Sequence, residues 1–181
     1  RIMSTASVHE WDQAARGWHS HTARIRDWLQ DVTPAMLNSA GITRGSRVLD
    51  VAAGAGGQTL DIAHRTGTQG HVLATDISPR ILALAQENAQ AAGFKQVKTQ
   101  LADAQELNLA GSGFDAAVCR LGLMFCKSPR DALSSIRRAL KPGGRFSAVV
   151  FSQPQKNPCV TIMMSTALKA AGLPPKPPFE P

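Results

Sequence analysis

Three aspartates in the first 103 residues each stand at or near the end of an apolar run. Asp50 lies within RVLDVAA, Asp76 within HVLATDI and Asp103 at the end of VKTQLAD. A carboxylate accepts hydrogen bonds from hydroxyl and amine groups and favours a nearby cation. If the three runs are strands of one parallel sheet, the three carboxylates meet at one edge of it. The spacing therefore predicts a site for a ligand that is rich in hydrogen-bond donors.

A glycine-rich stretch follows the first aspartate. Gly54 and Gly56 stand among small residues in AAGAGG, between a strand-like run and a helix-like pattern. A strand that turns tightly into a helix presents free backbone N–H groups and the positive end of the helix at one place. A tight turn alone would account for one glycine. Two glycines among small neighbours indicate that a ligand comes close to the backbone.

The order of the glycines bears on the type of ligand. A dinucleotide fingerprint would need a third glycine where Thr59 stands, and a P-loop would need a lysine where Gln58 stands. The acid Asp50, just before the loop, also disfavours a phosphate group. The pattern therefore favours a cationic or neutral ligand.

The other two acids have one alternative role each. Asp76 follows Gly54 by 22 residues, where a carboxylate can accept from both ribose hydroxyls. It could instead begin a helix, but Ser78 already suits that position. Asp103 could accept from the amine of adenine or could cap a helical turn, and the sequence leaves both open.

The elements that must position these residues alternate regularly along the chain. Apolar runs without polar alternation are typical of strands buried on both faces, and helical patterns separate them. They predict a doubly wound, Rossmann-like α/β fold, with a mostly parallel sheet and helices on both faces. The expected strands are residues 47–53, 71–77, 97–103, 114–120 and 145–151, and the expected helices between them are 57–67, 78–93 and 128–140.

Three segments are expected. Residues 1–43 form an N-terminal helical lid segment, with one or two helices from Trp11 to Leu29 and a short one from Pro34 to Ala40 capped by Thr33. Residues 44–152 form the cofactor-binding core. Residues 153–181 form a further helix and a Pro-rich tail, which we expect to be truncated.

Composition narrows the class of protein. A hydrophobic content of 43% supports one buried core, and no apolar run is long enough for a transmembrane helix. Three cysteines without a CxxC pair favour free thiols and a cytoplasmic location over disulfides or zinc. The net charge of +7 comes from scattered Lys and Arg, so nucleic-acid binding is disfavoured.

Five motifs in order carry a family resemblance. They are VLDVAAGAGGQTL, ATDISPRIL, ADAQEL, FDAAVCRLGLMF and LKPGGRF. Together they resemble the class I S-adenosylmethionine-dependent methyltransferases, in the branch of the ubiquinone/menaquinone biosynthesis methyltransferases. The resemblance spans about residues 44–151 and implies S-adenosylmethionine as the cofactor.

The resemblance also implies a role for each matching position. Gly54 and Gly56 would flank the methionine part of the cofactor, and Asp50 would orient the loop and the cofactor amino group. Asp76 would bind the ribose. The other implied cofactor contacts are Ala52 (where the family usually has glycine), Ile77 beside the adenine, Asp103 and Ala104 at its edge, and Arg120.

The acceptor side is less defined. In such enzymes the segment before the first strand covers the substrate, and this implies a pocket lined by Trp11, Trp18, Leu121 and Met124, with Phe125 beside them. His19 and His21 are weak candidates for a base, because a histidine on a surface helix is more often solvated. No catalytic residue is otherwise assigned, and no metal is expected.

Two other functions stay open at this point. One is an NAD(P)-dependent oxidoreductase on a doubly wound fold, and the other is a protein that binds the cofactor without turnover. The methyl acceptor is expected to be a small molecule, and a homo-oligomer is possible. Because the family's sheet has seven strands, we expect either a longer native protein or a partner chain that covers the edge of strand five.

Overall fold

The computed structural model describes residues 5–172 and residue 174. The chain divides into two units, Arg1–Val149 and Val150–Pro181. The first unit holds both the N-terminal helices and the sheet. In the second unit, a short turn η3 (Pro154–Lys156) precedes helix α7 (Pro158–Ala170), where a C-terminal helix was expected.

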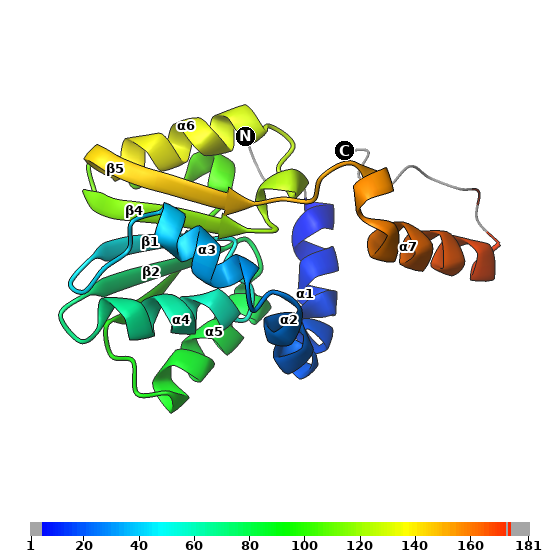
Figure 1. The fold of residues 1–181 in the computed structure, drawn as a ribbon, viewed down its shortest axis with the longest axis horizontal. Helices are drawn as coiled ribbons and strands as arrows, with labels where there is room; N and C mark the ends of the chain where they lie inside the picture. The colour runs from blue at the N-terminus through cyan, green and yellow to red at the C-terminus, as the bar shows by residue number, and fades with distance from the viewer. Residues whose placement is uncertain (1–4, 173, 175–181) are drawn as a thin grey trace. The chain divides into compact units, whose positions relative to one another are not determined.

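A five-stranded parallel sheet forms the centre of the first unit (Figure 1). Its order is β3-β2-β1-β4-β5, and every neighbouring pair runs parallel. The order reverses at β1, and ligands of open α/β sheets bind at such a reversal. The strands are β1 (Arg47–Val51), β2 (His71–Asp76), β3 (Val97–Leu101), β4 (Phe114–Arg120) and β5 (Leu140–Val149).

Helices cover both faces of this sheet, which confirms the expected fold class. Helices α3, α4 and α5 pack on one face, and α6 packs on the other. The helices of this unit are α1 (Thr5–Ser20), α2 (Thr22–Trp28), α3 (Val32–Ser39), α4 (Gly57–Thr66), α5 (Pro79–Ala91) and α6 (Pro129–Ala139), with short turns η1 (Ala104–Glu106) and η2 (Leu123–Phe125).

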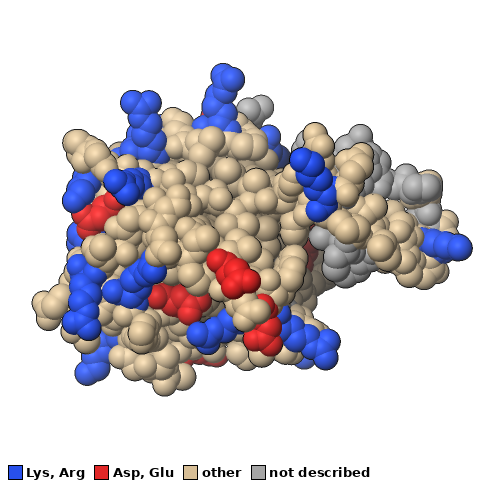
Figure 2. All heavy atoms as spheres, viewed as in Figure 1, with Lys and Arg blue, Asp and Glu red and all other residues tan. Residues whose placement is uncertain are grey.

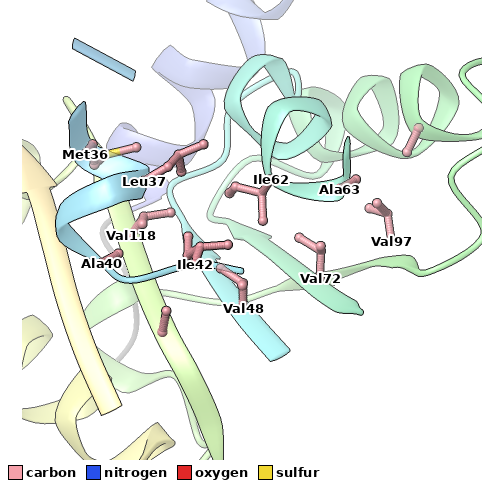
Figure 3. Packing of buried hydrophobic residues seen from close by; sticks show 12 residues of the cluster. Met36, Leu37, Ala40, Ile42, Val48, Ile62, Ala63, Val72, Val97 and Val118 are labelled. Atoms are coloured by element: carbon pink, nitrogen blue, oxygen red, sulfur yellow. The ribbon is translucent and has the colours of Figure 1, made fainter. Parts of the chain in front are cut away.

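Two layers of core side chains follow from the alternation along the strands. Val48 and Val118 lie on the face covered by α3 and α4, where Met36 and Ile62 meet them (Figure 3). Leu49 belongs to the cluster on the opposite face. Because successive side chains of a strand point to opposite faces, Asp50 and Arg120 lie on the same face as Val48 and Val118. Strand register thus directs these two charged side chains toward α3 and α4.

Local signals fixed most of the helix ends. Ser78 caps α5 by accepting a hydrogen bond from the Ile81 backbone N–H at 3.1 Å, and Pro79 follows as the first helical residue. Gly93 closes α5 with φ of 77°. These predictions are confirmed. The cap predicted for α3 is wrong, because α3 begins at Val32 and Thr33 lies buried inside its first turn.

The fifth strand begins earlier than predicted. It starts at Leu140, so the KPGG turn lies inside β5. The pairing with β4 jumps from Leu140 opposite Phe114 to Arg145 opposite Ala116. The extra residues bulge out, helped by the positive φ of 79° at Gly143.

Charged side chains and helix hydropathy describe the surface of the chain. On the face seen in Figure 2, Lys and Arg are spread around the rim, with Asp and Glu among them. No helix in the described part of the chain is both long and apolar enough to cross a bilayer.

Candidate functional site

The glycine-rich loop connects β1 to α4 at the carboxyl edge of the sheet. Gly56 has φ of 87° and is the N-cap residue of α4. A Cβ on Gly56 would lie 3.1 Å from both Cα and Cβ of Ala85, so close packing against α5 requires glycine there. Gly54 also has positive φ, at 58°, but a Cβ there would meet no atom within 4 Å. The loop is therefore packed on its α5 side and open at Gly54, where a ligand can reach the backbone.

Two residues other than glycine adopt left-handed backbone conformations at this edge. Ala52, after β1, has φ of 55°, and Leu121, after β4, has φ of 60°. Next to Leu121, a Cβ on Gly122 would collide with the Cβ of Ala52. Because strained backbone of this kind gathers at functional sites, the pair marks the ends of β1 and β4 as a functional edge.

Replacing Ala52 with glycine is expected to raise the free energy of unfolding by about 1 kcal/mol, because the left-handed conformation costs an L-residue roughly that much. Urea denaturation of Ala52→Gly and wild type measures the change. Ala53→Gly is the matched control: Ala53 is buried and has no positive φ, so this variant is expected to lose stability. A loss of equal size in both variants would contradict the assignment of strain to Ala52.

Asp76 faces the glycine-rich loop from the end of β2. Its Oδ2 accepts from the Gly54 backbone N–H at 2.9 Å, and its Oδ1 accepts from the Ser78 backbone N–H at 3.0 Å. Burial raises the pKa of Asp76, although the backbone N–H groups of Ser78, Gly54 and Ile77 oppose this and Asp12 adds to it. Each carboxylate oxygen keeps a second lone pair. The carboxylate is therefore fixed in place and can still accept from two ligand hydroxyls.

Asp50 is completely buried beneath the loop. Its oxygens accept from the Thr59 hydroxyl at 2.6 Å and from the Gln58 side-chain amide at 3.0 Å. Burial raises the pKa of Asp50 to about 6, against the opposing effects of these two donors and of Arg120. Asp50 thus holds the first turn of α4 under the loop. Its negative charge lies under the glycine-rich loop and would attract a cationic ligand group bound on the other side of the loop.

Arg120 ends β4 on the same face as Asp50. Its Nη1 donates to the Thr33 hydroxyl of α3 at 2.7 Å. Burial lowers the pKa of Arg120, and the charges of Asp50 and Asp61 oppose this. A Cβ on Gly57 would lie 3.2 Å from Nη2, so the guanidinium lies against the start of α4. The site therefore places one cation beside its buried acid.

Asp103 follows β3, which ends two residues earlier, at Leu101. Its Oδ1 accepts from the backbone N–H of Gln105 at 2.9 Å, and both oxygens accept from the Gln105 side-chain amide at 3.1 Å. Capping of η1, one of the two roles left open by the sequence, is thus realised. Ile77 and Ala104 are both half-buried beside the acids that precede them.

The expected acceptor residues lie on α1 and on the segment after β4. The rings of Trp11 and Phe125 pack edge to face, with centroids 5.1 Å apart and planes at 77°. Phe125 is 54% exposed, whereas Leu121 and Met124 are half-buried. The structure therefore brings Trp11 to η2. The side chain of Trp18 lies outside the described residues.

The two candidate bases lie on the surface. His19 and His21 are exposed at the end of α1 and in the turn after it. His21 Nδ1 lies 2.9 Å from the Gly17 carbonyl oxygen and 3.0 Å from the Ser20 hydroxyl. These contacts are local to the turn, and they tie neither histidine to Asp76 or to the loop.

The described residues include free thiols but no cluster of candidate metal ligands. No three His, Cys, Asp or Glu side chains there are gathered as a metal site. Cys119 and Cys126 are free thiols, and burial raises the pKa of each.

Several site residues carried no sequence signal of their own. Thr33 holds Arg120, and Gln58 and Thr59 hold Asp50. From sequence alone, hydroxyl and amide side chains at the start of a helix are usually predicted to lie on the surface. Only the buried acid beside them could have indicated their role, since a buried carboxylate needs donors.

Comparison with known proteins agrees with this geometry. A family model described as a methyltransferase domain matches residues 42–171. A curated relative from Azotobacter vinelandii, a ubiquinone/menaquinone biosynthesis C-methyltransferase, is 37% identical over 152 residues, which cover 78% of this chain and 60% of that protein. The chain thus spans less than two thirds of the length of such relatives; for a second one, from Idiomarina loihiensis, the share is 47%.

Solved structures share the architecture. A methyltransferase from Aquifex aeolicus, described as S-adenosylmethionine-dependent, superposes with a TM-score of 0.65 at 20% identity, over 82% of this chain and 86% of that one. The cyclase SpnF superposes with a TM-score of 0.60 at 28% identity, over 65% of this chain and 43% of that one. The fold thus occurs in proteins named for different reactions.

Proposed function

The chain belongs to the methyltransferase domain family, in the branch of the ubiquinone/menaquinone C-methyltransferases, and we propose that it transfers a methyl group from S-adenosylmethionine to a small-molecule acceptor. The observation that carries the proposal is the fixed carboxylate of Asp76 at the open glycine, Gly54. The open backbone of the glycine-rich loop and the carboxylate at the end of β2 thus lie together.

The residues at this edge fit the cofactor by their chemistry. Asp76 would accept from the two ribose hydroxyls, and Gly54 would lie against the methionine part. Asp50 would favour the cationic sulfonium and ammonium groups through its charge. Arg120, whose guanidinium suits carboxylates, would attract the carboxylate of the methionine part. Ile77, Ala52, Gly56, Asp103 and Ala104 would complete the cofactor contacts.

When bound, the cofactor supplies a methyl group already activated by positive sulfur. The task of the chain is then to position the acceptor in line with the methyl group and to exclude water. Trp11 and Phe125 would help to exclude water, because their paired rings join α1 to the segment after β4. A general base is needed only if the acceptor must lose a proton. We assign none, and His19 and His21 remain weak candidates.

The acceptor is proposed to be a small apolar ring compound. The curated relatives are named for quinone biosynthesis, and this chain offers apolar side chains of matching character at Trp11, Leu121, Met124 and Phe125. Aromatic and apolar walls favour flat rings. A cytoplasmic location and assembly into a homo-oligomer, both expected from the sequence, stay predictions.

The two alternative functions are less well supported. For a nicotinamide-dependent oxidoreductase, the third fingerprint glycine would be at position 59, but Thr59 is buried there and donates to Asp50. For a protein that does not transfer a methyl group, the one favouring observation is the likeness to SpnF, which is named as a cyclase. A transfer assay separates this second alternative from the proposed reaction.

The chain is expected to move label from methyl-labelled S-adenosylmethionine into an apolar dihydroxyarene, with S-adenosylhomocysteine formed in equal amount. Organic extraction and scintillation counting measure the label. Glu87→Gln, an exposed change on α5, is the matched control and is expected to retain the rate. Saturable cofactor binding without product from any of several such ring acceptors would refute the proposed transfer and favour the non-catalytic alternative.

A further inference from the structure

Helix α1 connects two loops that are far apart in the sequence. One of its residues, Asp12, contacts the start of α5, which follows β2. The residue before it, Trp11, packs on η2, which follows β4. In the sheet, β1 lies between β2 and β4, so the glycine-rich loop lies between the two attachments. Figure 1 shows α1 standing beyond the carboxyl ends of the strands.

The Asp12 attachment is made of two hydrogen bonds to the first turn of α5. Asp12 Oδ1 accepts from the Ser78 hydroxyl and from the Arg80 backbone N–H, the latter at 3.3 Å. A carboxylate is favoured there, because the first turn of a helix has free N–H groups and partial positive charge. Bonds to an ionised acceptor are stronger than neutral ones. Asp12 therefore attaches α1 to the first turn of α5 through a charged acceptor.

Ser78 joins this attachment to the acid proposed to bind ribose. Its hydroxyl donates to Asp12, and its backbone N–H donates to Asp76 at 3.0 Å. Ser78 itself is fully buried. Two carboxylates from different elements thus hold the same serine. A movement of α1 that releases Asp12 acts directly on the residue that orients Asp76.

The side chains of α1 that the structure describes are mostly half-buried or exposed. Among the side chains of α1 that the structure describes, Ala15 alone is buried. The helix ends at Ser20, and α2 starts at Thr22 after a single-residue turn. An element with few buried apolar contacts opens at low free energy. Loss of the Asp12 attachment should therefore change how often the helix opens.

We propose that Asp12 is a positioning residue that fastens α1 as a strap across the glycine-rich loop, and that release of this strap limits cofactor exchange. This inference rests on the proposed function, since it concerns the same site. The Trp11–Phe125 contact is the second fastening, at the other side of the loop. Cofactor would enter and leave when Asp12 separates from Ser78.

Asp12→Ala is expected to speed dissociation of S-adenosylhomocysteine about tenfold, the change that loss of a charge-assisted hydrogen bond implies. Stopped-flow displacement of the bound compound measures the rate. Glu10→Ala is the matched control, an exposed acid on the same helix, and its rate is expected to stay within twofold of wild type. Asp12→Asn, which keeps an acceptor oxygen, should restore much of the slow rate.

Trypsin cleavage reports on the strap without any ligand. Arg16 lies in α1 and is exposed, so cleavage after it should be faster in Asp12→Ala than in wild type or Glu10→Ala. If wild type binds S-adenosylhomocysteine and Asp12→Ala shows unchanged dissociation and cleavage, the strap is refuted and the proposed function stands. If wild type does not bind the compound, the proposed function fails, while cleavage still reports whether Asp12 fastens α1.

Discussion

Asp76→Asn is expected to raise the dissociation constant for S-adenosylmethionine about a hundredfold, because two charge-assisted hydrogen bonds to ribose lose their ionised acceptor. The backbone adds to the effect. Both carboxylate oxygens already accept N–H groups, from Gly54 and Ser78. The asparagine NH₂ group must face one of these donors, so the variant also disturbs the loop.

Calorimetric titration of wild type and Asp76→Asn measures this change. Glu87→Gln removes an exposed carboxylate of α5 and is expected to bind as wild type does. The melting temperature of each variant checks that it is folded. An Asp76→Asn variant that binds within threefold of wild type would show that this carboxylate does not hold the ribose.

Asp50→Asn is expected to stabilise the fold and to weaken cofactor binding. Asp50 is fully buried, and its pKa rises from 3.8 to about 6 because burial penalises the charged form. At neutral pH the ionised side chain therefore destabilises the native state by about 3 kcal/mol, at 1.36 kcal/mol for each pKa unit. An uncharged amide of the same shape removes this penalty, and the Gln58 amide can turn to accept from it.

The sign of the pH dependence follows from this shift. The folded state binds the proton of Asp50 more tightly than the unfolded state does, so its contribution to stability is largest below the unfolded pKa. That contribution falls as the pH rises from about 4 to about 6, and it is constant above that range. The stability advantage of Asp50→Asn should therefore grow with pH, by about 1.4 kcal/mol between pH 5 and pH 8.

Urea denaturation at both pH values measures this difference between variant and wild type. Titration with S-adenosylmethionine at pH 8 should show at least tenfold weaker binding for Asp50→Asn, because the negative charge below the loop is lost. Thr59→Val serves as a comparison. It removes a donor that lowers the pKa of Asp50, and it should lose stability instead. An Asp50→Asn variant less stable than wild type at pH 8 would contradict a buried, destabilising charge.

The sequence was sufficient to predict the sheet and most helix ends. The runs at β1, β2 and β4 are apolar because both faces of these strands are covered, and such runs are visible without any structure. Ser78 with Pro79 marked the start of α5 for an equally local reason. Placement of Asp76 at the glycine-rich loop also followed, because parallel strands bring their carboxyl ends to one edge.

Contacts between distant parts of the chain could not be predicted. Arg120 meets Thr33 across 87 residues, and Asp12 meets Ser78 across 66. No periodicity encodes such pairs, since they depend on how α3 and α1 pack on the finished sheet. The same limit explains the wrong cap at Thr33. A threonine before proline is typical of a helix start, but here tertiary packing buried it inside α3.

Calorimetric titration of the wild-type chain with S-adenosylhomocysteine tests whether the carboxyl edge of the sheet binds the proposed cofactor. We expect saturable heat with one site per chain, and a melting temperature that rises with ligand concentration. Folded protein that gives no heat at millimolar concentrations of this compound, while NAD does bind, would contradict it.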